Sequence, residues 1–518
     1  MNDKKSLFTL PDGRNVAVTF VLVSSLFLLW GFCNGMIDTM DKHFQDQLNL
    51  TKAQSAWVQF AHYMGYSIMA LPAGLMIQRT GYKWGIIFGL VMVAVGGFWF
   101  IPATSISTFW AFLLGVCAIA MGLTILETVA NPYTTVLGGK DLAATRINLA
   151  QSFNGVGWIL GPVVGGAFFY SDQGHHVAHG QLWIPYAGVG VVVLVLAVLF
   201  YFAPVPELKV EDEYHTDDAA GSPAAAVRPK QPGLVALFLF LNVVVCAVSL
   251  YLVLNAILPF CGVELAGIRY ATMGIVAAVL LTIPTLLRTS RTITEHSIWA
   301  HPHFAGATIA QFLYVAAQAG IFSFFINYVI SEMPAISRSF ADLWPINGRV
   351  IERDGALFVT EQGASRLQGF VAFLLFTIGR FVGSAILKRV PAHRVLGTYA
   401  LINVVLCGVV ALDLGWISVA AVFLSFYFMS IMFPTVFALG IHGLGAQAKK
   451  KAAAFIVMAI TGGALMPKIM GHLGDVHSMA ISFLMPFGCF IGIALYGFLW
   501  PTLSGRAQGP SVSAAKGH

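Results

Sequence analysis

Long apolar stretches separated by short polar segments run along almost the whole chain of 518 residues. A helix that crosses a lipid bilayer needs about 20 predominantly apolar residues, and most of these stretches approach or reach that length. The pattern therefore predicts a polytopic helical membrane protein with about fourteen transmembrane helices. The predicted spans are residues 16–40, 54–77, 84–102, 108–135, 147–171, 182–203, 233–258, 267–288, 303–330, 366–388, 394–412, 415–440, 452–473 and 479–500.

Polar segments divide these spans into groups of six, two and six. Residues 204–232 are rich in Pro, Ala, Asp and Glu, a composition typical of a flexible linker. We expect an N-terminal six-helix bundle over 1–203, a cytoplasmic linker over 204–232 and a C-terminal six-helix bundle over 301–518. Two inserted transmembrane helices with a cytoplasmic connector then occupy 233–300. The charged segment 331–365 is expected as a periplasmic loop of the second bundle.

Lysine and arginine residues predict the topology. They gather in every second loop, whereas the intervening loops are poor in them. Because cytoplasmic loops carry an excess of Lys and Arg, we expect a multi-pass protein of the inner membrane with both termini in the cytoplasm. The apolar run that begins at Val16 is too long for a cleavable signal, so we expect it to be the first helix.

Composition excludes several classes of function. Hydrophobic residues make up 58% of the chain and charged residues only 10%, whereas soluble domains carry about 25% charged residues. A soluble enzyme, a nucleic-acid-binding protein and a disordered chain are therefore excluded. The net charge of +6 is assigned to the cytoplasmic loops. The chain has no hydrolase elbow, zinc-protease motif, Walker loop or dinucleotide fingerprint, and its six cysteines form no CxxC pair, so we expect no enzyme, cofactor or metal site.

Glu127 is an ionisable residue inside an apolar span, within GLTILETVANPYTTVLG. Such residues are costly in a membrane and usually face a cavity or a charged partner. Asn131 lies one turn later on the same face, and a carboxylate beside a carboxamide suits hydrogen bonding to a polyhydroxylated ligand. A structural pair with a neighbouring helix is the alternative. We favour the cavity because this half offers no obvious intramembrane Lys or Arg partner.

Asp38 lies in the first predicted span, one turn after Asn34, in FLLWGFCNGMIDTMDK. A carboxyl group in a surrounding of low dielectric can take up and release a proton during a transport cycle. The alternative is an ordinary ion pair with Lys42 near the end of the helix.

Amide side chains on other spans are further candidates for ligand binding. Gln151 and Asn154 share a helix face, and so do Gln311, Tyr314 and Gln318. Interhelical hydrogen bonds and packing seams are the alternative roles for both sets. Gln59, His62 and Tyr66 form a similar stripe, which we interpret as a packing seam, and Gly157, Gly161 and Gly165 repeat every four residues, as close helix packing requires.

The chain also resembles the major facilitator superfamily and, within it, the L-fucose–proton symporter family. The strings that carry this resemblance cover nearly all of both six-helix groups, and LETVANP and NLAQSFN are fairly specific to the family. In the first half they are FLLWGFCNGMID, QFAHYMGYSIMALPAGLMIQRTGYKWGI, LETVANPYTTVLG and RINLAQSFNGVG. In the second half they are AQFLYVAAQ, GRFVGSAILKRVPAHRVL, FMSIMFPTVFALGI and AAFIVMAITGGALMPKIMG.

The resemblance implies an all-α major facilitator fold and alternating access between the two halves around a central sugar site. It implies that Glu127 contacts the sugar and that Asp38 is the protonation site. We therefore expect proton-coupled symport of a hexose or deoxyhexose such as glucose, galactose or fucose. The candidate substrate-binding residues are Glu127, Asn131, Gln151, Asn154, Asn34, Gln311 and Gln318, and the candidate coupling residues are Asp38 and Glu127.

Several departures from the family keep alternatives open. The helices within 233–290 are additional, Gly35 stands where fucose symporters tend to have a second Asn, and Lys468 is unusual. Sodium is an alternative coupling ion. The string GWILGPVVGG fits fourteen-helix drug antiporters of the same superfamily, so a proton-linked antiporter is the second hypothesis and a non-transporting membrane receptor the third. The expected partners are a sugar, a proton and the lipid bilayer, without nucleic acid, and we expect a monomer.

Overall fold

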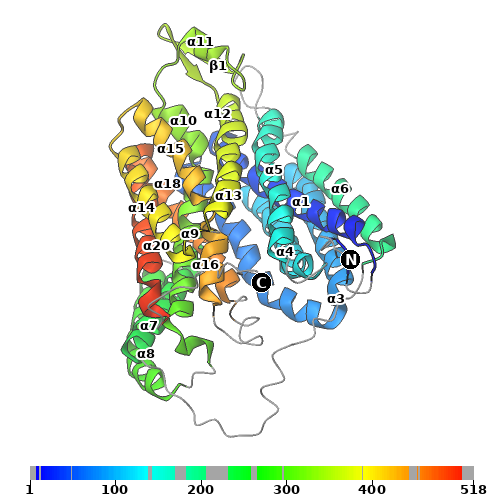
Figure 1. Cartoon of the computed structure of the whole chain (residues 1–518). Helices are drawn as coiled ribbons and strands as arrows, with labels where there is room; N and C mark the ends of the chain where they lie inside the picture. The colour runs from blue at the N-terminus through cyan, green and yellow to red at the C-terminus, as the bar shows by residue number, and fades with distance from the viewer. Residues whose placement is uncertain are drawn as a thin grey trace.

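The computed structural model describes residues 8–10, 13–47, 50–137, 143–169, 183–205, 232–257, 265–293, 297–387, 389–442, 452 and 455–504. Most of these residues form long helices that stand side by side in two groups, with a β-hairpin at one end of the bundle (Figure 1). The predicted linker 204–232 lies almost entirely outside the described residues.

The first group of helices comes from the N-terminal half of the chain. Its longest member, α3, contains two of the predicted spans, because the chain continues helically on both sides of Gly81, whose φ of 80° makes a kink. Glycine is suited to this position because it has no Cβ to clash in the left-handed region. The helices are α1 (Ala17–Gln47), α2 (Lys52–Ser55), α3 (Trp57–Ile106), α4 (Phe109–Val136), α5 (Ala143–Phe169) and α6 (Trp183–Phe202).

Glycines let α1 and α5 cross at short distance. A Cβ on Gly161 would lie 2.7 Å from the Cα of Gly35, and a Cβ on Gly157 would collide with the backbone of Leu28. The prediction that the glycines of α5 serve close packing is therefore confirmed for Gly157 and Gly161. The same crossing explains Gly35, since a Cβ there would come within 2.9 Å of Pro162.

Two helices, α7 (Pro232–Ile257) and α8 (Leu265–Thr292), follow the first group. They pack against each other, and α7 also packs against the second group, where the Asn242 side chain donates to the Ala305 carbonyl at 3.0 Å and accepts from the Thr308 hydroxyl at 2.6 Å. Large apolar side chains of α8 are exposed, Leu281 to 76%. Such a surface suits contact with lipid.

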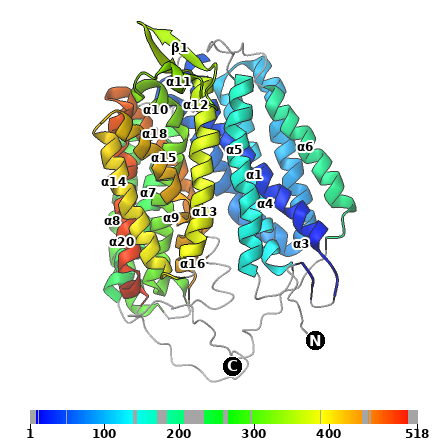
Figure 2. The same ribbon diagram turned by 45° about the horizontal axis from the view of Figure 1, so that its top comes forward.

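The second group contains the remaining helices (Figure 2). Several predicted spans are interrupted helices here, such as α9 with α10 and α15 with α16. The elements are η4 (Ile298–Ala300), α9 (Pro302–Ser323), α10 (Phe325–Glu332), α11 (Arg338–Ala341), α12 (Glu361–Leu367), η5 (Gln368–Ala372), α13 (Phe373–Leu387), α14 (Ala392–Ala411), α15 (Trp416–Met429), α16 (Met432–Gly440), η6 (Ala459–Thr461), α18 (Gly462–Val476), α19 (Met479–Ser482) and α20 (Leu484–Leu503).

The predicted loop 331–365 has structure of its own. It contains α11 and an antiparallel hairpin of β1 (Val350–Arg353) and β2 (Ala356–Val359). Asp354 and Gly355 form the turn with φ values of 52° and 75°, as an Asp-Gly pair between alternating strand residues favours. We call the end of the bundle that carries this hairpin the hairpin end.

The membrane assignment follows from the helices themselves. Among the described residues, 11 helices are long and apolar enough to cross a membrane. At other predicted spans, α5, α7 and the first part of α3 are helical as well. The all-α membrane fold is thus confirmed, whereas the number fourteen stays a prediction.

Candidate polar site between the halves

Polar side chains of α1 and α3 meet residues of α9 where the two halves of the chain touch. Asp38 is at the centre of this contact and is only 4% exposed. Its Oδ1 accepts a hydrogen bond from the Gln59 amide at 2.8 Å and one from the Ser323 hydroxyl at 3.5 Å. Ser323 ends α9, so one of these donors comes from the opposite half. The side chain of Lys42, the alternative partner of Asp38, lies outside the described residues.

Asp41 is a second buried carboxyl group at the same place, and it is not among the candidate residues predicted from the sequence. The Gln59 amide nitrogen lies 3.3 Å from Asp41 Oδ2, so a single amide reaches both carboxyl groups. The available signal was the spacing of three residues between Asp38 and Asp41, which places both on one helix face. Gln59, interpreted as part of a packing seam, is instead a hydrogen-bond donor to this pair.

Glu127 of α4 lies near an aromatic cluster of α3. Glu127 is 9% exposed, and its carboxyl group interacts electrostatically with the phenol groups of Tyr66 and Tyr63. Tyr66 accepts a hydrogen bond from the Trp30 indole and also interacts with Asn34. Asn34 is therefore brought beside the surroundings of Glu127, as a common site requires.

Tyr63 connects this cluster with the carboxyl pair and with the second half. It interacts electrostatically with Asp38, Asp41, Glu127 and Tyr314 of α9. Tyr63 of α3 therefore has acidic groups of α1 and α4 and a tyrosine of α9 within electrostatic range.

Asn154 joins the two halves through the half-buried side chain of Arg380. Its side chain is completely buried, donates to the Phe27 carbonyl at 3.3 Å and accepts from Arg380 Nη1 at 3.3 Å. The Arg380 Nε also donates to the Ser430 carbonyl at 3.3 Å, and its guanidinium lies 4.7 Å from the centre of the Phe376 ring. The role of Arg380 thus includes the backbone-carbonyl contact of an ordinary structural arginine and a direct contact with a predicted site residue.

The remaining candidate residues belong to α9, α5 and α4. Gln311 is completely buried, and neither of its amide atoms has a hydrogen-bond partner. Gln318 and Gln151 are half-buried on α9 and α5. Asn131 belongs to α4, but its side chain lies outside the described residues.

Further contacts between the halves lie toward the hairpin end. The Gln45 and Asn327 side chains exchange two hydrogen bonds, of 2.5 and 3.5 Å. The Lys52 backbone N–H donates to Asp475 at 2.9 Å. Lys468, which the sequence left unassigned, lies 3.7 Å from the centre of the Trp57 ring, a cation–π contact between α18 and α3. Together these contacts hold the two halves against each other at this end.

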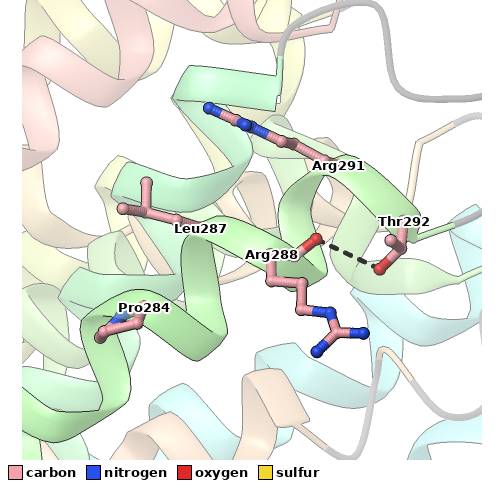
Figure 3. A pocket seen from close by; sticks show the side chains of 5 residues that line it. All are labelled: Pro284, Leu287, Arg288, Arg291 and Thr292. Carbon is pink, nitrogen blue, oxygen red and sulfur yellow. Dashed lines mark hydrogen bonds between the residues drawn. The ribbon is translucent and has the colours of Figure 1, made fainter.

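A pocket lies apart from the polar site, near the end of α8. Figure 3 shows its lining, and Thr292 donates there to the Arg288 carbonyl at 3.2 Å. Its residues all come from one helix, so it does not bear on the contact between the halves: Pro284, Leu287, Arg288, Arg291 and Thr292. Within the described ranges, no group of three or more His, Cys, Asp or Glu residues could hold a metal ion.

The two helical groups and their polar contact agree with a known transporter family. The model of the Major Facilitator Superfamily matches residues 18–351, more than half of the chain. The chain belongs to the Major Facilitator Superfamily. Members of this family are transporters and not enzymes, which explains why the sequence lacks enzyme motifs.

Curated relatives extend over nearly the whole chain. It is 30% identical to the L-fucose-proton symporter of Escherichia coli K12 over 504 residues, which cover 94% of this chain and 93% of the relative. It is 27% identical to the glucose/galactose transporter of Brucella abortus over 489 residues, or 94% and 95% of the two chains. The resemblance to the fucose symporter family is therefore confirmed.

Solved structures agree with the fold. The crystal structure of the transporter FucP in the outward conformation matches with a TM-score of 0.57 and 29% identity, over 94% of this chain and 99% of that one. A peptide transporter POT in complex with sulfate matches with a TM-score of 0.61 over 98% and 99% of the chains. At 13% identity, this match supports the fold only. The glycine string that suggested an antiporter is accounted for by the crossing of α1 and α5.

Proposed function

We propose that this transporter couples the movement of a proton to the uptake of a monosaccharide, a hexose or deoxyhexose, by alternating access of its two halves. The names of its relatives, an L-fucose-proton symporter and a glucose/galactose transporter, support both the substrate class and the coupling ion.

The single observation that carries the proposal is the position of Asp38. This buried carboxyl group receives hydrogen bonds from its own half, through Gln59, and from the opposite half, through Ser323. A carboxylate only accepts hydrogen bonds, whereas a carboxylic acid can also donate one. Protonation of Asp38 therefore changes the contact between the halves, which is the link that a proton-coupled transporter needs.

Glu127 is assigned to the sugar. Its carboxylate can accept hydrogen bonds from sugar hydroxyls, and the rings of Tyr63 and Tyr66, which are within its electrostatic range, can offer apolar faces to the C–H side of a sugar ring. Further polar groups would complete the site from both halves as they move: Asn34, Asn131, Gln151, Asn154, Gln311 and Gln318. We also keep Glu127 as a second candidate for proton coupling.

The placement in the membrane completes the proposal. The distribution of Lys and Arg in the sequence favours cytoplasmic termini in an inner membrane, with the hairpin end on the periplasmic side. On that orientation, the contacts Gln45–Asn327 and Lys52–Asp475 close the periplasmic side. We propose a monomer in the bilayer that needs no cofactor.

Transport in proteoliposomes tests the proposed function. Uptake of radiolabelled fucose, glucose and galactose is measured with an inward proton gradient, an inward sodium gradient and no gradient. We expect accumulation of at least one sugar with the proton gradient alone. Absence of accumulation for every sugar contradicts the proposal, and accumulation driven only by sodium contradicts the coupling ion. Efflux of bulky organic cations would indicate an antiporter instead.

A further inference from the structure

Asp38 and Asp41 form a pair of carboxyl groups with too few donors for two negative charges. Asp38 is 4% exposed and Asp41 is completely buried. The Gln59 amide reaches one oxygen of each, and the other oxygen of each, Asp38 Oδ2 and Asp41 Oδ1, is buried without a hydrogen-bond partner. Two carboxylates this close cannot both stay ionised at low cost in a medium of low dielectric.

The groups that face the pair from neighbouring helices do not neutralise two charges. On α3 these are Gln59 and Tyr63, and on α9 the facing group is Ser323. Tyr186 of α6 interacts electrostatically with Asp41, while its hydroxyl donates to Met40 Sδ at 2.9 Å. Tyr63 also interacts electrostatically with the acidic Glu127 of α4, and the ring of His62 lies 5.0 Å from the ring of Tyr63. The side chains that donate hydrogen bonds to the pair, Gln59 and Ser323, are an amide and a hydroxyl group, and both are uncharged.

We propose that Asp41 completes the proton site, so that Asp38 and Asp41 hold one proton between them with the Gln59 amide as their common hydrogen-bond donor. This inference rests on the proposed function, which assigns proton coupling to Asp38. The proton comes from water on the side to which the site opens and forms an O–H bond on one carboxyl group. It is held against the other carboxylate and leaves to water on the opposite side, where the water that reaches the open site solvates the two carboxylates.

The chemical reason for a pair is affinity for the proton. A neighbouring negative charge favours the neutral form of a carboxyl group, as in other sites where two carboxyl groups share a proton. A pair can therefore stay loaded at a proton concentration at which a single carboxyl group beside an amide would be empty. Because the Ser323 hydroxyl is hydrogen-bonded to Asp38, its contact with the pair changes when the pair gains or loses the proton.

The test compares the pH dependence of uptake in the wild type with that in Asp41→Asn. We expect the pH at which proton-driven uptake falls to half its maximum to move down by about one unit, a tenfold rise in the proton concentration needed. Asp41→Glu retains the carboxyl group and is expected to restore the wild-type profile. Asp342→Asn, a matched change outside the bundle, is expected to leave the profile unchanged. An unaltered profile in Asp41→Asn contradicts the proposal.

Lys42 allows a second test of the shared proton. It follows Asp41 in the sequence, and its positive charge is an alternative way to balance the two carboxylates. We expect Lys42→Gln to shift the midpoint by much less than Asp41→Asn does. A shift of equal size in the upward direction would mean that a lysine, and not a shared proton, balances the pair.

A spectroscopic titration tests the shared proton site independently of sugar transport. Infrared difference spectra of the purified protein, recorded against pH, follow the C=O band of protonated carboxyl groups without any substrate. We expect one titrating band from the pair in the wild type, and a changed midpoint in Asp41→Asn. If no sugar is transported but this band behaves as expected, the proposed function fails and the paired proton site stands. If sugar is transported and the band is unaffected by Asp41→Asn, only the pair is refuted.

Discussion

The two halves of this transporter bring different chemistry to their common contact. The first half supplies the buried carboxyl groups of Asp38, Asp41 and Glu127, whereas the second supplies the hydroxyl group of Ser323 and the guanidinium of Arg380. The groups proposed to bind the proton thus lie almost entirely in one half, and the other half touches them through a hydroxyl that can donate or accept. This division suggests that the first half carries the coupling and the second half responds to it.

The largest expected effect breaks the coupling in the first half. Replacing Asp38 by Asn removes the titratable group but keeps a hydrogen-bond acceptor for Gln59 and Ser323. We expect gradient-driven accumulation to fall at least tenfold, while exchange of labelled for unlabelled sugar across the membrane persists. Asp354→Asn in the hairpin turn is the control, since Asn tolerates the left-handed backbone there. Full accumulation in Asp38→Asn would show that the coupling group is elsewhere.

Linking the two halves tests whether they separate at the hairpin end. In a variant without the six native cysteines, Cys residues replace Gln45 and Asn327, whose side chains touch. We expect a short bifunctional thiol reagent to reduce uptake at least fivefold. When the reagent contains a disulfide, addition of a reductant should cleave the link and restore uptake. The control introduces the two Cys residues at Asn242 of α7 and Thr308 of α9 instead. These side chains share a hydrogen bond but do not join the two halves. Unimpaired uptake in the linked protein contradicts an opening at this end.

Removing Glu127 is expected to weaken sugar binding more than coupling. Hydrogen bonds to a charged group contribute about 1.5–3 kcal/mol, so Glu127→Ala should raise the dissociation constant roughly 10–100-fold. Isothermal titration calorimetry on the purified protein measures this, with Glu352→Ala on the hairpin as the matched change. Unchanged affinity for every transported sugar would remove Glu127 from the site.

The smallest effect concerns the second half. Gln311 and Asn403 are both completely buried, with amide atoms that have no hydrogen-bond partner, but only Gln311 belongs to α9, the helix whose Ser323 donates to Asp38. Replacing either by Leu removes an unsatisfied polar group, so neither change is expected to lower thermal stability in detergent. Gln311→Leu is expected to weaken sugar binding about three- to tenfold, since it removes about one hydrogen bond, and Asn403→Leu to leave it unchanged. Equal affinities in both variants would make Gln311 a structural residue.

Much of the architecture could be predicted from the sequence because it depends on local properties. A long apolar run must form a helix in a membrane, since every backbone polar group has to be bonded within it. Gly157 and Gly161 of α5 could be assigned to packing by their spacing alone, and Asp38 and Glu127 were conspicuous as charges among apolar residues. The hairpin within 350–359 was overlooked, although the Asp-Gly pair at its turn was a readable signal.

The pairing of polar residues was decided only by the tertiary structure. Gln59 and Asp41 are 18 residues apart, Asn154 and Arg380 are 226 apart, and Asp38 and Ser323 are 285 apart. An apolar helix has little amphipathic pattern to say which face it turns inward, so its rotation depends on the helices packed around it. The sequence by itself determined that long apolar segments form membrane helices and that Asp38 and Glu127 are costly there, because both follow from the composition of single helices. The contact between the halves determined that Asp41 and Gln59 join Asp38, because hydrogen bonds between helices form only once packing has set their rotation and depth.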